Sequence, residues 1–256
     1  MFSPPSMGYD RAITIFSPDG RLYQVEYALE AVKRGLTTLG IVCKDGAVLV
    51  AERRKFSPLL DENTVEKIVK IDDHIAFAYA GLGPDARILM EQARTDAQIH
   101  RLLYDEAIPP ETLVRRICDI KHTYTMYGGA RPFGVAFLVI GIDNDRPVLL
   151  GTEPGGAYAG YKAYVLGAGS QAAQEILEKE LKDKEPTVEE GIILALDILR
   201  RVSERTLTAE EIEVGVIDVK TKKFRKLTKE EIANYLAQIK KVKQISLDFF
   251  YSYIHA

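Results

Sequence analysis

The order of strand-like and helix-like segments is the feature that most limits the fold of this 256-residue chain. Strand-like segments come in groups joined by short turns, and pairs of helix-like segments separate the groups. Single strands alternating with helices would favour a parallel sheet, whereas groups joined by hairpins favour antiparallel sheets. We therefore predict an α+β fold, a four-layer α-β-β-α sandwich in which two antiparallel sheets lie between helix pairs.

The predicted elements follow from hydrophobic periodicity and turn residues. A first helix begins near Leu22 and is ended by Gly35, and the turn Lys44-Asp45-Gly46 joins strands Thr38–Cys43 and Ala47–Ala51 into a hairpin. Further strands are predicted at 65–71, 74–80, 134–143, 148–152, 163–167, 212–219 and 224–227. Further helices are predicted at 85–104, 110–127, 170–181, 188–205 and from a capping box at Thr228 to about residue 243.

Composition argues against several classes of protein. The net charge of −3 offers no basic surface for nucleic acid, and the longest apolar stretch, Gly134–Ile142, is too short to cross a membrane. The segment Met1–Tyr9 lacks the apolar centre of a signal peptide. Cys43 and Cys118 are expected to be buried free thiols, which suits a reducing compartment and a cytoplasmic location. We expect no cofactor, no nucleic-acid partner and no membrane partner.

Three segments near the N-terminus carry an identifiable pattern: YDRAIT at 9–14, FSPDGRL at 16–22 and QVEYA at 24–28. Together they resemble the signature of proteasome α subunits. EKI at 66–68, AGL at 80–82, DAR at 85–87 and YGGARPFG at 127–134 agree with the same family. The resemblance covers residues 7 to about 240, and the segment 7–14 resembles the archaeal branch of the family.

The resemblance implies both a fold and a set of partners. The family has the four-layer sandwich, and its α subunits form a seven-membered ring stacked on a ring of β subunits. The assembled particle hydrolyses unfolded polypeptides, which enter through the α ring, and ring-shaped ATPases or other activators dock on that ring through their C-termini. We accordingly divide the chain into a mobile gate arm at 1–12, a single domain at 13–243 and a C-terminal tail of unassigned role at 244–256.

The family's β subunits cut peptides with an N-terminal threonine, whose hydroxyl attacks and whose free amine acts as the base. Aligning Gly40 with the family's glycine places Leu36 where that threonine would stand. Processing before Thr37 would create an N-terminal threonine, but one out of register with Glu52 and Lys67, which match the β subunit's acidic and lysine partners in order. We predict that the chain has no catalytic residue and is not itself an enzyme. A threonine-type peptidase subunit is the alternative.

The resemblance also assigns roles to individual residues. Leu22, Gly35 and Lys67 match an activator-binding pocket between neighbouring α subunits, in which the lysine holds a terminal carboxylate. A second set, the gate cluster, consists of Tyr9, Asp10, Pro18 and Tyr27. Simpler interpretations exist, since Lys67 could be a solvated lysine at a strand end, Pro18 a turn proline and Tyr27 an aromatic residue on a helix face.

Two other patterns have competing interpretations. Gly167-Ala168-Gly169 precedes a helix as a dinucleotide-binding loop would, but no strand ending in Asp or Glu follows about 20 residues later. We favour a structural turn there. The four histidines have no spacing typical of a metal site and are expected on the surface or in loops.

Overall fold

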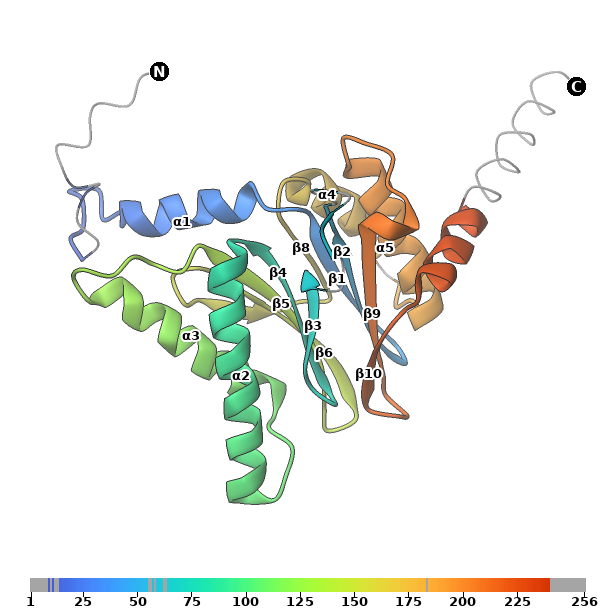
Figure 1. The fold of residues 1–256 in the computed structure, drawn as a ribbon, viewed down its shortest axis with the longest axis horizontal. Coiled ribbons are helices and arrows are strands. Elements are labelled where there is room, and N and C mark those ends of the chain that lie inside the picture. The colour runs from blue at the N-terminus through green and yellow to red at the C-terminus, as the bar shows by residue number, and fades with distance from the viewer. Residues whose placement is uncertain are drawn as a thin grey trace, which may run out of the picture.

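The computed structural model describes residues 9, 11, 14–54, 57, 59–61, 64–182 and 184–239. They form an α+β fold with two five-stranded sheets, in which every neighbouring pair of strands is antiparallel (Figure 1). Sheet A has the order β10 (Lys223–Lys226), β9 (Ile212–Asp218), β2 (Gly46–Glu52), β1 (Thr38–Cys43) and β8 (Ala163–Leu166). Sheet B has the order β3 (Ile68–Asp72), β4 (Ile75–Gly81), β5 (Val135–Asp143), β6 (Arg146–Thr152) and β7 (Tyr158–Gly160).

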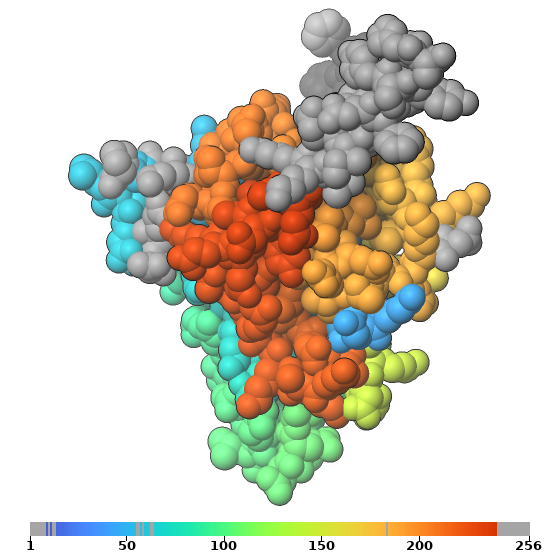
Figure 2. Space-filling view, turned by 90° about the vertical axis from the view of Figure 1, so that its right-hand side faces the viewer, coloured from blue at the N-terminus to red at the C-terminus, as the bar shows by residue number. Residues whose placement is uncertain are grey.

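Helices cover the outer face of each sheet. Helices α2 (Gly83–Tyr104) and α3 (Pro110–Met126) pack on sheet B. Helices α4 (Ser170–Glu180) and α5 (Val188–Val202) pack on sheet A together with the helical segment 229–239, and Figure 2 views this side. Helix α1 (Tyr23–Lys33) lies across one end of the strands, at the top of Figure 1. None of the helices in the described ranges is long and apolar enough to span a bilayer.

A layer of small side chains separates the two sheets. The alanines of β4 at 76, 78 and 80 face sheet A, whereas Phe77 and Tyr79, which alternate with them, face α2 and α3. This alternation is the two-residue period of a strand buried on both faces. A Cβ added at Gly40 on β1 would lie 2.7 Å from Cδ1 of Leu149 on β6, so the two sheets approach closely at that point.

The structure confirms the predicted four layers. The predicted first hairpin is also confirmed: β1 pairs with β2 as far as Cys43 and Gly46, and Lys44 and Asp45 form the turn between them. The capping box at Thr228 is also confirmed, since Thr228 N–H donates to Glu231 (2.8 Å) and Glu231 N–H donates to Thr228 Oγ1 (3.2 Å). The predicted end of that helix near residue 243 lies outside the described residues. Cys43 and Cys118 are buried free thiols, as predicted, and burial raises their pKa values to about 12 and about 11.

Two predicted boundaries were wrong by three residues, and one short strand was not predicted. Strand β3 begins at Ile68 rather than residue 65, because the N–H groups of Lys67 and Ile68 donate to the side chain of Glu213 instead of to a neighbouring strand. Helix α5 ends at Val202 rather than residue 205, and the Arg205 side chain beyond it donates to Glu211 and Glu52. Strand β7 was not predicted, since three residues are too few for a periodic pattern.

An ion pair joins two segments that the sequence pattern had singled out separately. Asp85, in the first turn of α2, accepts two hydrogen bonds from the Arg131 guanidinium (2.6 and 2.7 Å) and one from Gly134 N–H (2.9 Å). These contacts, with the guanidinium contributing most, hold the pKa of Asp85 below its usual value. Leu82 N–H donates to Gly134 O (2.9 Å) beside this pair. The junction between β4 and α2 is therefore fixed against the start of β5.

Candidate functional site

A groove runs beside helix α1 at the end of β4. It has a volume of about 670 Å³, and we call it the α1 groove; its lining residues are Tyr27, Glu30, Ala31, Arg34, Gly35, Gly81 and Leu82. The groove brings together one predicted residue of the activator pocket, Gly35, and one of the gate cluster, Tyr27. Tyr27 is 49% exposed and Leu82 is 43% exposed, so part of the lining is accessible apolar surface.

Gly35 is required here by space rather than by backbone conformation. Helix α1 already ends at Lys33, and Gly35 has no positive φ, so it is not a left-handed cap of the kind common after helices. A Cβ added at Gly35 would lie 2.5 Å from the backbone nitrogen of Gly81 and 3.0 Å from the carbonyl oxygen of Val32. The absence of a side chain lets the chain leaving α1 touch the end of β4.

The other predicted residues of the pocket and gate lie apart from Gly35. Leu22 is the N-cap of α1, which separates it from Gly35 by roughly 20 Å at 1.5 Å per residue. Pro18 is exposed in a turn that Gly20 closes with φ +75° and an N–H donated to Ser17 O (2.8 Å), so the predicted turn is confirmed. Tyr9 is partly exposed, and Asp10 lies outside the described residues.

Lys67 is buried within its own chain, with 6% of its surface exposed, so it is not the solvated lysine of the simpler interpretation. Its ammonium lies 3.9 Å from the centre of the Tyr79 ring. The carboxylate of Glu213 accepts hydrogen bonds from the backbone of Lys67 (3.1 Å) and of Ile68 (3.0 Å). Burial lowers the pKa of Lys67 to about 8, although the negative charges of Glu213 and Glu52 act in the opposite direction. Lys67 does not line the α1 groove.

A second hollow surrounds Thr37 and its neighbour Leu36, the residue aligned with the catalytic threonine of the related peptidases. It has a volume of about 250 Å³, and Leu36, Glu52, Gly169 and Arg205 are among its lining residues. The Thr37 hydroxyl accepts a hydrogen bond from Gly169 N–H (3.1 Å), and Thr37 O accepts one from Glu52 N–H (2.8 Å). The described lining includes no lysine or histidine that could serve as a base for Thr37.

The loop 167–169 is explained by packing. Gly167 has φ +95°, and a Cβ there would lie 2.6 Å from Leu36 O. The N–H of Ala168 donates to Gly35 O (2.9 Å), and that of Gly169 donates to Thr37 Oγ1. In a dinucleotide-binding loop such N–H groups face a phosphate. Here they bind the chain between α1 and β1, which supports the structural turn.

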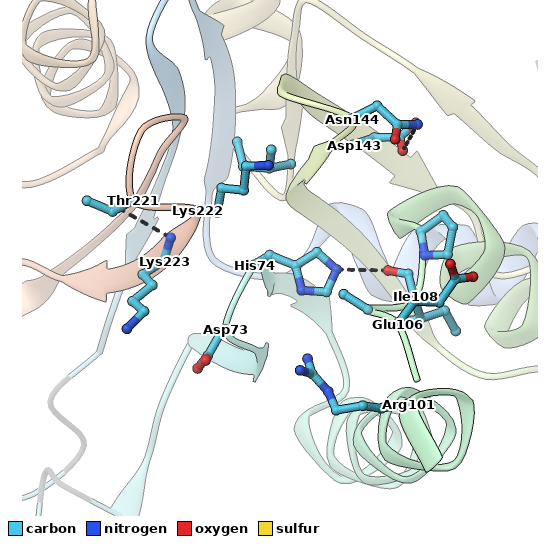
Figure 3. Close-up of a pocket in the computed structure, with 13 residues that line it drawn as sticks. Asp73, His74, Arg101, Glu106, Ile108, Asp143, Asn144, Thr221, Lys222 and Lys223 are labelled. Carbon is cyan, nitrogen blue, oxygen red and sulfur yellow. Dashed lines mark hydrogen bonds between the residues drawn. The ribbon is translucent and has the colours of Figure 1, made fainter. Parts of the chain in front are cut away.

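Two histidines are buried; His74 lies in the turn between β3 and β4, in keeping with the predicted loop position, whereas the predicted surface or loop position was wrong for His100, which lies within α2. The Nε2 atom of His74 lies 2.8 Å from Ile108 O, and His100 packs against Tyr104 with 4.7 Å between ring centres. His74 borders a polar hollow of about 440 Å³ at the far end of β4 (Figure 3). Arg101 and Lys222 beside it are paired with Asp72 and Asp145. Within the described ranges, no three His, Cys, Asp or Glu residues are grouped to hold a metal ion.

Lys121, which is completely buried in α3, was not predicted as a special residue from the sequence. Its ammonium donates to Thr152 Oγ1 (2.8 Å) and Val135 O (3.1 Å), and burial lowers its pKa to about 7. Ile117 lies one helical turn before Lys121 on the same buried face of α3. The helical spacing of the apolar residues was therefore a signal in the sequence that Lys121 is buried. Glu213 and Tyr79, the partners of Lys67, carried no signal of that kind, because their contacts depend on strand packing.

Comparison with known proteins gives one consistent result. Residues 32–217 match the family model described as "Proteasome subunit", and residues 9–31 match the model of the N-terminal signature of A-type proteasome subunits. The chain is 52% identical to a proteasome alpha subunit of Pyrococcus abyssi over 240 residues, covering 94% of this chain and 91% of the relative. It is 51% identical to the proteasome alpha subunit of Methanosarcina thermophila over 235 residues, covering 92% of this chain and 95% of the relative. It is 50% identical to that of Archaeoglobus fulgidus over 232 residues, covering 91% of this chain and 94% of the relative.

The close contact at Gly35 predicts a loss of stability when a side chain is added. Gly35→Ala should lower the free energy of unfolding by about 1–3 kcal/mol, because the new methyl group meets backbone atoms that cannot rotate away. Gly128→Ala is the matched control, since its Cβ would have no heavy atom within 4 Å. Urea denaturation of the two variants measures the difference, and an equal loss in both would contradict the packing role of Gly35.

Proposed function

The chain belongs to the proteasome α-subunit family, and on that premise we propose that it is a non-catalytic subunit of the α ring of a proteasome core particle. In this role it scaffolds assembly with six further α subunits and with β subunits. It also gates the entry of unfolded polypeptides and docks the C-termini of ring-shaped ATPases or other activators. We place this assembly in the cytoplasm.

The position of Leu36 carries the non-catalytic part of the proposal. The residue aligned with the nucleophile has an aliphatic side chain, and the peptide chain continues through α1 before it. An N-terminal threonine mechanism needs a hydroxyl and a free amine on the same residue. Thr37 has the hydroxyl, but it accepts a hydrogen bond from Gly169 and its nitrogen is part of a peptide bond.

Docking and gating are supported by the surface around α1. Gly35 and Tyr27 share the α1 groove, whereas Leu22 lies at the other end of the same helix. A pocket built from Leu22 and Gly35 together therefore requires two neighbouring subunits, each contributing one end of its α1. This arrangement agrees with a pocket at the subunit interface, and it joins the docking residues to the turn that holds Pro18.

The absence of a catalytic role predicts an inert ring. The purified chain should assemble into rings that cleave no fluorogenic peptide, since no residue combines a free amine with the nucleophile. Thr37→Ala should leave the peptidase activity of the complete core particle within about twofold of wild type, because Thr37 takes no part in the cleavage. Activity in rings free of β subunits that disappears in Thr37→Ala would establish the threonine-type peptidase instead.

The gate arm predicts a dependence on substrate length. Deleting residues 2–12 from the assembled core particle should accelerate hydrolysis of long unfolded polypeptides, because an aperiodic polar segment over a pore obstructs large substrates most. Short peptides should show little change. Equal rates for casein before and after the deletion, in particles of confirmed composition, would contradict gating by this segment.

Docking through Lys67 predicts a dependence on both charge and pH. Lys67→Ala should abolish activator-stimulated hydrolysis, because removal of one partner of a desolvated charge pair typically costs about 2–5 kcal/mol and several sites act together. With a pKa of about 8, the free lysine loses its proton as the pH rises, so docking should weaken about tenfold between pH 7 and pH 9.

Two variants control this experiment. Lys67→Arg keeps its charge throughout that range, so its partial docking should not depend on pH. Lys70→Ala removes an exposed lysine in β3, three residues after Lys67, whose ammonium pairs with Asp73, and this variant should dock normally. An activator peptide with an amidated C-terminus should fail on the wild-type particle. Normal stimulation of the Lys67→Ala particle would show that the pocket residues do not carry over to this chain.

A further inference from the structure

The ammonium group of Lys67 already has a binding site inside its own chain. It lies over the face of Tyr79, 3.9 Å from the ring centre, which is a cation–π geometry. Tyr79 is in turn fixed on β4, where its carbonyl oxygen accepts a hydrogen bond from Thr38 Oγ1 (3.2 Å). The backbone of Lys67 is held from the other side by Glu213.

This position is incompatible with simultaneous capture of an external carboxylate. Lys67 is almost completely covered and does not line the α1 groove. The lysine side chain has a flexible four-carbon stem, so its ammonium can move while Glu213 continues to hold the backbone. A docked peptide terminus therefore has to draw the ammonium away from the Tyr79 ring.

We propose that Tyr79 holds Lys67 in a stored position, and that release from the Tyr79 ring is the step that sets the affinity of this site for a peptide carboxylate. The inference rests on the docking role proposed for Lys67. Tyr79 is thus a positioning residue that makes the site selective. A ligand without a free carboxylate offers no negative charge to replace the cation–π contact, so the ammonium stays over the ring.

Tyr79 also lines a cavity of about 340 Å³ between β3 and α2, with Thr64, Glu66, Gly83 and Arg87 among the other lining residues. A cation–π contact of ordinary strength favours the stored position by on the order of 2- to 30-fold. When only part of the population is competent to bind, the apparent affinity falls by that same factor.

The experiment uses the assembled core particle and a fluorescent peptide that copies the C-terminus of an activating ATPase from the source organism. Tyr79→Leu removes the ring face and should tighten binding on the order of 2- to 30-fold. Tyr79→Phe keeps the ring and should bind within about twofold of wild type. The same peptide with an amidated terminus should gain nothing from either variant. Unchanged or weaker binding by Tyr79→Leu, with Tyr79→Phe normal, would overturn the proposal.

A second measurement covers the case in which Tyr79→Leu fails to assemble. The lysines of the wild-type particle are labelled with ¹³C-methyl groups, and the Lys67 signal is assigned by its loss in Lys67→Arg. Ring current should shift that signal upfield in the free particle, and saturating peptide should return it to the ordinary lysine position. A signal that is not upfield in the free particle, or that stays upfield at saturation, would overturn the stored position.

The two proposals fail in different ways. If Lys67→Ala binds the peptide normally, the docking role itself is wrong. If Lys67→Ala abolishes binding while the methyl signal never moves, docking through Lys67 stands and only the role of Tyr79 is wrong.

Discussion

Close packing between the two sheets sets the geometry of the rest of the molecule. Alanines on β2, β4 and β5, together with Gly40, keep the inner side chains small where the sheets face one another. Larger residues such as Leu49 and Leu138 fill the remaining space between them. Side chains in such a layer interdigitate at crystal-like density, so the sheets cannot slide without opening cavities. The ends of β1 and β4 are consequently held at fixed positions, and the hollow at Thr37 and the α1 groove lie at those ends.

At that end of the sandwich, glycines make direct contacts between backbones. Added Cβ atoms would lie 2.5 Å from Gly81 N at Gly35, 2.2 Å from Gly134 O at Gly81 and 2.6 Å from Leu36 O at Gly167. The Asp85–Arg131 pair fixes the same region, since Asp85 also binds Gly134 N–H. The sequence motifs at 80–82, 85–87 and 127–134, which are separate in the chain, thus form one contiguous structure. Gly35 and Gly81 of this structure also line the α1 groove.

Local sequence features predicted the parts of the fold that depend on local physics. The hairpin at Lys44 and Asp45 and the cap at Thr228 follow from residues close in sequence, and both were confirmed. The burial of Lys67 could not be predicted, because it requires Glu213, which is 146 residues away, and Tyr79 on a neighbouring strand. Gly35 was predicted to end the first helix, but its close approach to Gly81 across the fold could not be read from the residues around it.

The internal contacts of the Thr37 region bear on the role proposed for this sandwich in a ring. Thr37 and the two residues that match the peptidase's acidic and lysine partners are all engaged within the chain: Thr37 with Gly169, Glu52 with Arg205, and Lys67 with Tyr79. A catalytic cleft needs such groups aimed at a substrate, with donors and a base left available. Groups bound to one another instead stabilise the end of the fold from which α1 projects. That end carries the surface on which docking and gating are proposed to occur.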